Sequence, residues 1–184
     1  MVNKAVFCDR DGVINVDYGY VGKVEDFMLL RGVKEGLAAF RKSGYRLILT
    51  TNQSGIARGM YTEADFMELT AHMQELLGPG AHFDAVYFCP HHPEATVAKY
   101  REDCDCRKPK PGMFLNAERD FNLDMSACLC IGDHASDLLA AKNAGVGRLI
   151  LVGDHLKEER EKLSALTFAY YPDLRACART LTGF

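Results

Sequence analysis

Two aspartates separated by one residue follow a short apolar run near the start of the chain. Asp9 and Asp11 belong to Asp9-Arg10-Asp11-Gly12, directly after Ala5-Val6-Phe7-Cys8. One carboxylate can attack phosphorus and form an aspartyl phosphate, which divides a difficult displacement into two steps. The second can protonate the leaving oxygen and then activate water. Aspartate and glycine are also common in solvated turns, so this segment is only moderately specific by itself.

Three further segments would complete a phosphoryl-transfer site. The first begins at Thr51, where a hydroxyl and backbone N–H groups can hold phosphate oxygens. In the second, Lys108 can neutralise the transferring phosphoryl group, while Arg107 can bind another anionic group. In the third, Asp133 would complete an acidic pocket for Mg²⁺, which prefers oxygen ligands, and Asp137 either supports that pocket or caps a helix. Taken alone, each of these segments is equally typical of a turn, a helix cap or a basic surface. The specific evidence for a phosphoryl-transfer site is that all four segments occur in this order along the chain.

Apolar runs and helical patterns alternate along the chain. The runs are apolar on successive residues, as in strands covered on both faces, and they predict strands at 4–8, 46–51, 85–89, 127–131 and 148–152. Helices are predicted at 33–43, 63–77, 111–121, 136–144 and 173–180. This alternation predicts an α/β fold with a doubly wound, Rossmann-like parallel sheet. Such sheets bind ligands at the carboxyl ends of their strands, which is where the candidate residues fall.

Length and charge limit the class of protein. The 184 residues predict one domain, 1–184. The net charge of -3, without a clustered basic surplus, argues against nucleic-acid binding. No apolar run approaches the roughly 18 residues of a membrane span, so we expect no membrane association. The residues Met1-Val2-Asn3-Lys4 lead into a short apolar run without a cleavage site, so we expect no signal peptide and a cytoplasmic protein. We also expect a monomer.

A long irregular stretch, residues 90–110, is unusual for a compact domain and calls for a stabilising element. Three of the seven cysteines and a pair of histidines fall in or beside it. Three thiolates and one imidazole form a closed tetrahedral zinc set, typical of a structural site. Free thiols with surface histidines are the weaker alternative. The predicted zinc-binding loop covers about 89–108, with the ligands Cys89, Cys104, Cys106 and either His91 or His92.

The order of these groups (nucleophile and acid, hydroxyl, lysine, metal aspartate) resembles the four motifs of the haloacid dehalogenase superfamily. The resemblance implies that Asp9 is the nucleophile, Asp11 the general acid/base, and Thr51 and Lys108 the groups that stabilise the phosphoryl group. It also implies that Asp9, Asp133 and the backbone carbonyl of Asp11 hold Mg²⁺. The intervals between the motifs leave no room for a separate cap domain, so we expect a capless, fairly open site.

Longer segments narrow the resemblance. DRDGVIN at 9–15, DYGYV at 17–21, TNQSGIARG at 51–59, CPHHP at 89–93 and CDCRKPKPGM at 104–113 resemble the heptose-bisphosphate phosphatases of the histidinol-phosphatase-like branch. This resemblance implies a sugar phosphate substrate in the synthesis of a lipopolysaccharide precursor, with His91 as the zinc ligand. It implies substrate contacts at Asp17, Tyr18, Gly19, Tyr20, Thr51, Asn52, Gln53, Ser54, Arg107, Lys108 and His134.

Two features of the substrate assignment follow from the same resemblance. Arg107 is the expected contact for the remote C1 phosphate. Relatives often carry lysine where this chain has His134, which we expect to be less positively charged at neutral pH, so the preferred anomer is left open. The alternatives are a histidinol-phosphate phosphatase and, in a different class, a catalytically silent zinc-binding scaffold.

Overall fold

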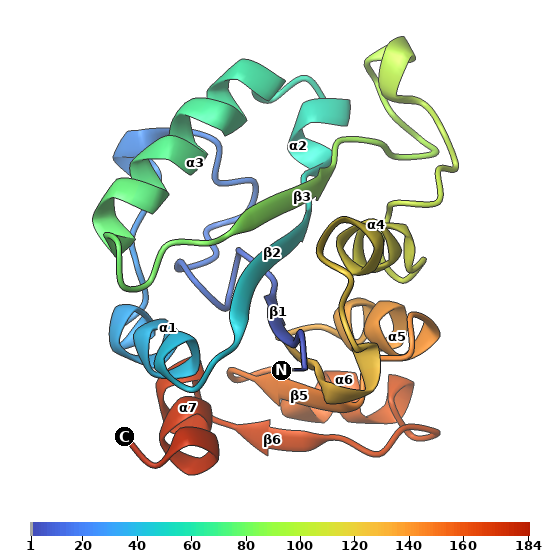
Figure 1. Ribbon diagram of the computed structural model, residues 1–184. Helices are drawn as coiled ribbons and strands as arrows, with labels where there is room; N and C mark the ends of the chain where they lie inside the picture. The colour runs from blue at the N-terminus through green and yellow to red at the C-terminus, as the bar shows by residue number, and fades with distance from the viewer. Residues whose placement is uncertain (1) are drawn as a thin grey trace.

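The computed structural model describes residues 2–184 and contains one six-stranded parallel sheet (Figure 1). The strand order is β3-β2-β1-β4-β5-β6. This topology confirms the doubly wound α/β fold predicted from the alternation of strands and helices. The strands are β1 (Ala5–Cys8), β2 (Arg46–Asn52), β3 (Ala85–Cys89), β4 (Leu129–Gly132), β5 (Arg148–Val152) and β6 (Ala169–Tyr171).

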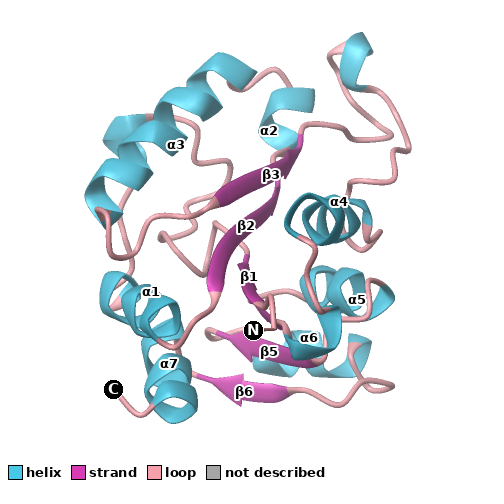
Figure 2. Cartoon of the chain, viewed as in Figure 1, coloured by secondary structure: helices cyan, strands magenta, loops and turns pink. Residues whose placement is uncertain are grey.

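Helices cover both faces of the sheet (Figure 2). One face packs against α1 (Val33–Lys42), α3 (Glu63–Leu77) and α7 (Leu174–Thr182). The other packs against α4 (Gly112–Phe121), α5 (Ala135–Asn143) and the end of α6 (Leu156–Lys162). A short helix, α2 (Ser54–Ala57), follows β2 directly.

Strand β1 shows why the sequences of the strands are apolar at successive residues. Val6 and Cys8 enter the core on the α1, α3 and α7 side, whereas Ala5 and Phe7 enter the core on the opposite side. The Phe7 ring lies 4.8 Å from the ring of Phe114 in α4, measured between centroids. All four residues of β1 are fully buried, as expected for a central strand of a covered parallel sheet.

Helix α3 begins with reciprocal side-chain capping. The Thr62 hydroxyl accepts from Asp65 N at 3.2 Å, and the Asp65 carboxylate accepts from Thr62 N at 2.7 Å, which together form a capping box at the start of α3. Apart from short 3-10 helices, the elements that were not predicted are α2, α6 and β6. Helix α2 has four residues and β6 three, too few to show a period, and six of the seven residues of α6 are polar or charged.

The path from β1 to β2 contains only a short 3-10 helix (Val24–Asp26) and α1, and the path from β2 to α4 contains α2, α3, β3 and the irregular loop. Within residues 2–184 no separate cap domain stands between the candidate catalytic segments. In the same residues no helix has both the length and the apolar character needed to cross a membrane.

Candidate active site and metal centres

The candidate catalytic segments meet at the carboxyl edge of the sheet. Strand β1 lies between β2 and β4, with Cys8 in register with Leu49 and Ile131. Asp9 N continues the β4 ladder by donating to Ile131 O at 3.1 Å. The strand order reverses between β1 and β4, and such switch points are the ligand-binding positions of open α/β sheets.

Lys108 is the buried centre of a charge network. Its ammonium group lies 3.0 Å from Asp9 Oδ1 and 2.6 Å from Asp137 Oδ1, and it donates to Thr50 O at 2.7 Å. Burial alone would lower the pKa of Lys108, but Asp137 and Asp9 outweigh burial and raise it. The lysine therefore stays charged beside the candidate nucleophile.

Burial raises the pKa of Asp9 to about 6, against the opposing effect of Lys108, and the charges of Asp137 and Asp11 add to the rise. Asp9 Oδ1 also accepts from Arg10 N at 2.8 Å. The site thus holds more negative charge than its one buried lysine neutralises, which favours a bound cation.

Asp11 is fixed by three side chains. Arg10 reaches both carboxylate oxygens through Nη2, at 2.9 and 3.0 Å. Asn15 Nδ2 donates to Asp11 Oδ1 at 3.0 Å, and Gln53 Nε2 donates to Asp11 Oδ2 at 3.2 Å. Gln53 is held in turn by the Tyr61 hydroxyl, which donates to its Oε1 at 2.6 Å. The carboxylate therefore has a defined orientation beside Asp9.

Arg10, Asn15 and Tyr61 were not among the predicted site residues. Arg10 is 1% exposed despite its charge, so it serves Asp11 and not the solvent. Its position between two aspartates was a usable signal, because an arginine at the end of a buried strand needs an anionic partner. Tyr61 gave no such signal, since its contact with Gln53 depends on how α2 turns.

Asp133 follows β4 and lies against the loop after β1. A Cβ atom at Gly12 would lie 2.1 Å from Asp133 Oδ2, so only glycine leaves the carboxylate its place. Burial raises the pKa of Asp133, the hydrogen bond with His134 opposes the rise, and the charge of Asp9 adds to it. These buried carboxylates offer oxygen ligands only, a donor set that fits Mg²⁺.

His134 is paired with the candidate magnesium ligand beside it. Its Nδ1 lies 2.9 Å from Asp133 Oδ1, and this hydrogen bond raises the pKa of His134 to about 9. The side chain predicted to contact substrate therefore also contacts Asp133. A cation on Asp133 would compete for the same carboxylate.

The four candidate zinc ligands form one cluster. They come from the end of β3 and from the irregular loop that joins β3 to α4, whose path is visible in Figure 1. The Sγ atom of Cys104 lies 3.4 Å from that of Cys89 and 3.2 Å from that of Cys106. His91 Nδ1 lies 3.6 Å from Cys106 Sγ. Ligands of a tetrahedral zinc, with Zn–S bonds of about 2.3 Å, are separated by similar distances of about 3.8 Å.

One observation distinguishes His91 from His92, and another supports a metal ion at this cluster. His91 faces the three sulfur atoms, whereas His92 Nδ1 accepts from Glu94 N at 3.1 Å. The thiol of Cys89 is the largest cause lowering the pKa of Cys106 to about 5, so the cluster favours a thiolate, the form that binds zinc. The set Cys89, His91, Cys104 and Cys106 has the composition of a structural zinc site.

The candidate zinc-binding loop is connected to Lys108, the candidate catalytic lysine. Cys106 precedes Lys108 by two residues, and Asn52 holds the Lys108 backbone from the other side. Asn52 Oδ1 accepts from Lys108 N at 3.0 Å, and Asn52 Nδ2 donates to Lys108 O at 3.1 Å. The backbone of Lys108 is therefore hydrogen-bonded to β2 on one side and linked through the chain to the cysteine cluster on the other.

Removal of zinc is expected to lower kcat by on the order of 100-fold, because Lys108 loses one of its two anchors and small misplacements of catalytic groups are costly. The measurement is phosphate release at saturating Mg²⁺ by Cys106→Ser or chelated protein, with zinc content determined on the same sample. Cys177→Ala, which removes a buried thiol from α7, is the matched control and should keep its zinc and turnover. A zinc-free sample with bound Mg²⁺ and full turnover would contradict the coupling.

A cavity of about 260 Å³ opens above these groups. It includes most of the predicted substrate-contact segment after β1. Its lining residues are Asp9, Asp11, Asp17, Gly19, Tyr20, Asn52, Ser54, Tyr61, Lys108, His134, Ser136 and Asp137.

Three predicted contacts lie around this cavity and one lies away from it. Thr51 and Gln53 are buried beneath it and joined by a 2.9 Å hydrogen bond. Arg107 Nη1 donates to the Ser54 hydroxyl at 2.8 Å, which places the guanidinium at the rim. The structure does not bring Tyr18 to the cavity, because its side chain is 63% exposed and its hydroxyl is directed to Met28 Sδ, 3.9 Å away.

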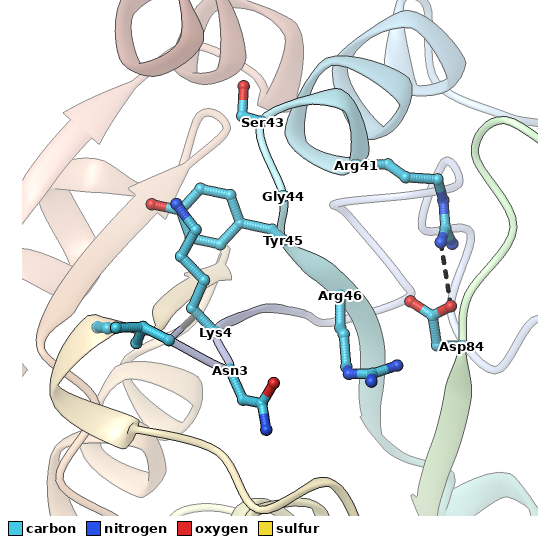
Figure 3. A pocket seen from close by; sticks show the side chains of 10 residues that line it. Asn3, Lys4, Arg41, Ser43, Gly44, Tyr45, Arg46 and Asp84 are labelled. Carbon is cyan, nitrogen blue, oxygen red and sulfur yellow. Dashed lines mark hydrogen bonds and ion pairs between the residues drawn. The ribbon is translucent and has the colours of Figure 1, made fainter.

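A larger hollow, of about 820 Å³, lies at the amino ends of β1 and β2 (Figure 3). Its main charged contact is already satisfied, since Arg41 Nη1 lies 3.0 Å from Asp84 Oδ1 and Asp84 Oδ2 accepts from Leu47 N at 2.7 Å. The chemistry therefore places the candidate active site in the smaller cavity, where carboxylates and a buried lysine converge.

Comparison with known proteins agrees with this geometry. Residues 3–145 match the family model described as haloacid dehalogenase-like hydrolase. The chain belongs to the haloacid dehalogenase-like hydrolases. It is 50% identical to the D-glycero-beta-D-manno-heptose-1,7-bisphosphate 7-phosphatase of Vibrio cholerae, over 90% of this chain and 91% of that protein. It is 46% identical to the enzyme of the same name from Photorhabdus laumondii, over 92% of each chain.

Among solved structures, this hydrolase is similar to the D,D-heptose 1,7-bisphosphate phosphatase of B. bronchiseptica, a complex with magnesium and phosphate. The TM-score is 0.82 and the identity 31%, and the match covers 98% of both chains. The shared architecture therefore extends beyond the catalytic segments to nearly the whole chain.

Proposed function

We propose that this hydrolase removes the C7 phosphate from D-glycero-D-manno-heptose 1,7-bisphosphate through an aspartyl-phosphate intermediate. The observation that carries the reaction is the Asp9 carboxylate, held 3.0 Å from the buried Lys108 ammonium and next to an oriented Asp11. The substrate is proposed from the names of the relatives, of which that from Vibrio cholerae is 50% identical. Those names specify the β anomer, which we adopt for this chain.

In the first step, an Asp9 carboxylate oxygen attacks phosphorus while Asp11 donates a proton to the C7 oxygen, and the bond from phosphorus to that oxygen breaks. In the second step, Asp11 takes a proton from water, whose oxygen attacks phosphorus and releases Asp9 and inorganic phosphate. Arg10, Asn15 and Gln53 keep Asp11 directed to the same place in both steps.

Two side chains would stabilise the phosphoryl group. Lys108 lines the cavity beside Asp9 and supplies positive charge, and the Thr51 hydroxyl, near the end of the neighbouring strand, can donate a hydrogen bond. Asp9, Asp133 and the carbonyl of Asp11 would hold Mg²⁺, which supplies positive charge to the transferring group. We further propose that zinc occupies the cysteine–histidine cluster as a structural ion.

The single chain carries every group named in this mechanism, so we propose that it acts as a monomer. Its role would be in the cytoplasmic synthesis of the heptose precursor of lipopolysaccharide or related surface sugars. Arg107, at the rim beside Ser54, would bind the C1 phosphate bidentately while the C7 phosphate lies over Asp9.

The test compares kcat/KM for the β and α heptose 1,7-bisphosphates and for histidinol phosphate. We expect the β-bisphosphate to be preferred. Arg107→Met should lower kcat/KM for the bisphosphate by about 10- to 100-fold, the value of a charged hydrogen bond. The same variant should act nearly as wild type on heptose 7-phosphate, which lacks the remote group. A wild-type preference for histidinol phosphate would refute the substrate assignment.

A further inference from the structure

Helix α6 carries a buried carboxylate that the mechanism above does not use. Glu159 is 4% exposed, while its neighbours Glu158 and Arg160 are exposed. Burying a carboxylate is costly unless hydrogen bonds compensate it. Its contacts therefore indicate what this side chain stabilises.

The contacts of Glu159 lead to the segment that carries Asp133. Glu159 Oε2 accepts from Ala135 N, the first residue of α5, at 2.6 Å. Glu159 Oε1 lies 2.7 Å from the Lys162 ammonium. Burial alone would raise the pKa of Glu159, but the hydrogen bonds from Lys162 and from Ala135 N outweigh burial and lower it.

The beginning of α5 is thus held by two carboxylates of different origin. Asp137 lies in α5 itself, and its Oδ2 accepts from His134 N at 3.1 Å. Glu159 comes from another helix and takes the next N–H along the chain. The unpaired N–H groups at a helix start favour anionic partners. The contact from Glu159 ties this turn to α6, a different helix of the fold.

A second contact joins the same two segments. His155, which directly precedes α6, has its ring centroid 5.5 Å from that of His134. The ring contact and the Glu159 hydrogen bond lie on consecutive residues of the turn, at His134 and Ala135. Asp133 is attached directly to His134, so its direction depends on a turn that α6 holds from outside.

We propose that Glu159 is a positioning residue for the magnesium ligand Asp133, acting through its hydrogen bond to Ala135 N. This inference rests on the proposed metal-dependent function. Loss of the hydrogen bond frees the turn and weakens Mg²⁺ binding. Changes in groups that orient metal ligands typically cost about 10- to 100-fold in metal affinity or activity.

Two substitutions distinguish the effect of side-chain length at position 159 from the effect of its charge. Glu159→Asp keeps the charge but shortens the side chain, so it cannot span to Ala135 N. Glu159→Gln loses the charge but keeps an oxygen that can accept from the same N–H. The measurements are Mg²⁺-dependent binding of beryllofluoride and the thermal midpoint without Mg²⁺. Glu158→Gln, on the exposed face of the same helix, is the matched control.

We expect Glu159→Asp to weaken Mg²⁺-dependent binding by about 10-fold or more. Glu159→Gln should stay close to wild type, and Glu158→Gln should be unchanged. A purely structural role would lower the thermal midpoint of Glu159→Asp with unchanged Mg²⁺ dependence, which would overturn the proposal. Equal losses in Glu159→Asp and Glu159→Gln would also overturn it, since the hydrogen bond would not be the cause. Failure of the wild type to bind beryllofluoride with Mg²⁺ would instead refute the proposed phosphatase function.

Discussion

Asp9→Asn is expected to lower phosphate release by more than about 1,000-fold, because an amide cannot form the aspartyl phosphate. The substitution keeps the shape of the side chain, and Lys108 retains Asp137 at 2.6 Å as a partner, so the fold should persist. The measurement is single-turnover phosphate release from the β-bisphosphate at saturating Mg²⁺, with circular dichroism to establish folding.

Asp11→Asn is the informative companion to this variant. Without the acid/base, a substrate with a good leaving group such as p-nitrophenyl phosphate should still phosphorylate Asp9 and produce a burst of p-nitrophenol. Hydrolysis of the intermediate would then be slow, because no carboxylate activates water. Asp9→Asn should give no burst. Turnover of Asp9→Asn close to that of the wild type would contradict the assignment of Asp9 as the nucleophile.

Lys108→Met is expected to lower kcat by about 100- to 1,000-fold, since it removes the buried ammonium group that lies 3.0 Å from Asp9, the residue to which the phosphoryl group would be transferred. Lys108 also lowers the pKa of Asp9, which burial holds at about 6. Its loss raises that pKa further, so more Asp9 is protonated at a given pH and the acid limb of the activity profile moves to higher pH. The measurement is the pH dependence of kcat/KM.

Lys110→Met provides the matched control for this prediction. Lys110 lies two residues away, is 39% exposed, and pairs with Asp103 at 2.8 Å on the surface. Surface pairs of this kind contribute little, so turnover and the acid limb should stay as in wild type. An unchanged acid limb in Lys108→Met would show that this lysine does not govern the ionisation of the nucleophile.

The positions of the catalytic groups could be predicted because parallel strands deliver their carboxyl ends to one edge. Asp9, Thr51 and Asp133 each follow or end an apolar run, and the structure brings their strands together as β1, β2 and β4. The three cysteines of the cluster could also be predicted from spacing, since Cys104 and Cys106 are separated by one residue within an otherwise irregular loop, whereas spacing left the histidine open between His91 and His92.

The supporting contacts could not be predicted, because they join segments whose separation in sequence carries no signal. Glu159 reaches Ala135 N from a helix that was not predicted at all. Tyr61 reaches Gln53 only after α2 has turned the chain back. The double hydrogen bond of Asn52 with the Lys108 backbone spans 56 residues. Such contacts depend on packing, whereas the predicted ones depended on strand order.

The space beside Gly12 has a consequence for the evolution of this chain. Alanine differs from glycine by a single methyl group, but at position 12 that group would lie 2.1 Å from Asp133 Oδ2. The backbone there also has a φ of +76°, which side chains other than that of glycine disfavour. Gly12 does not line the cavity over Asp9, yet position 12 should tolerate less change in evolution than the exposed Asp17, which does line it.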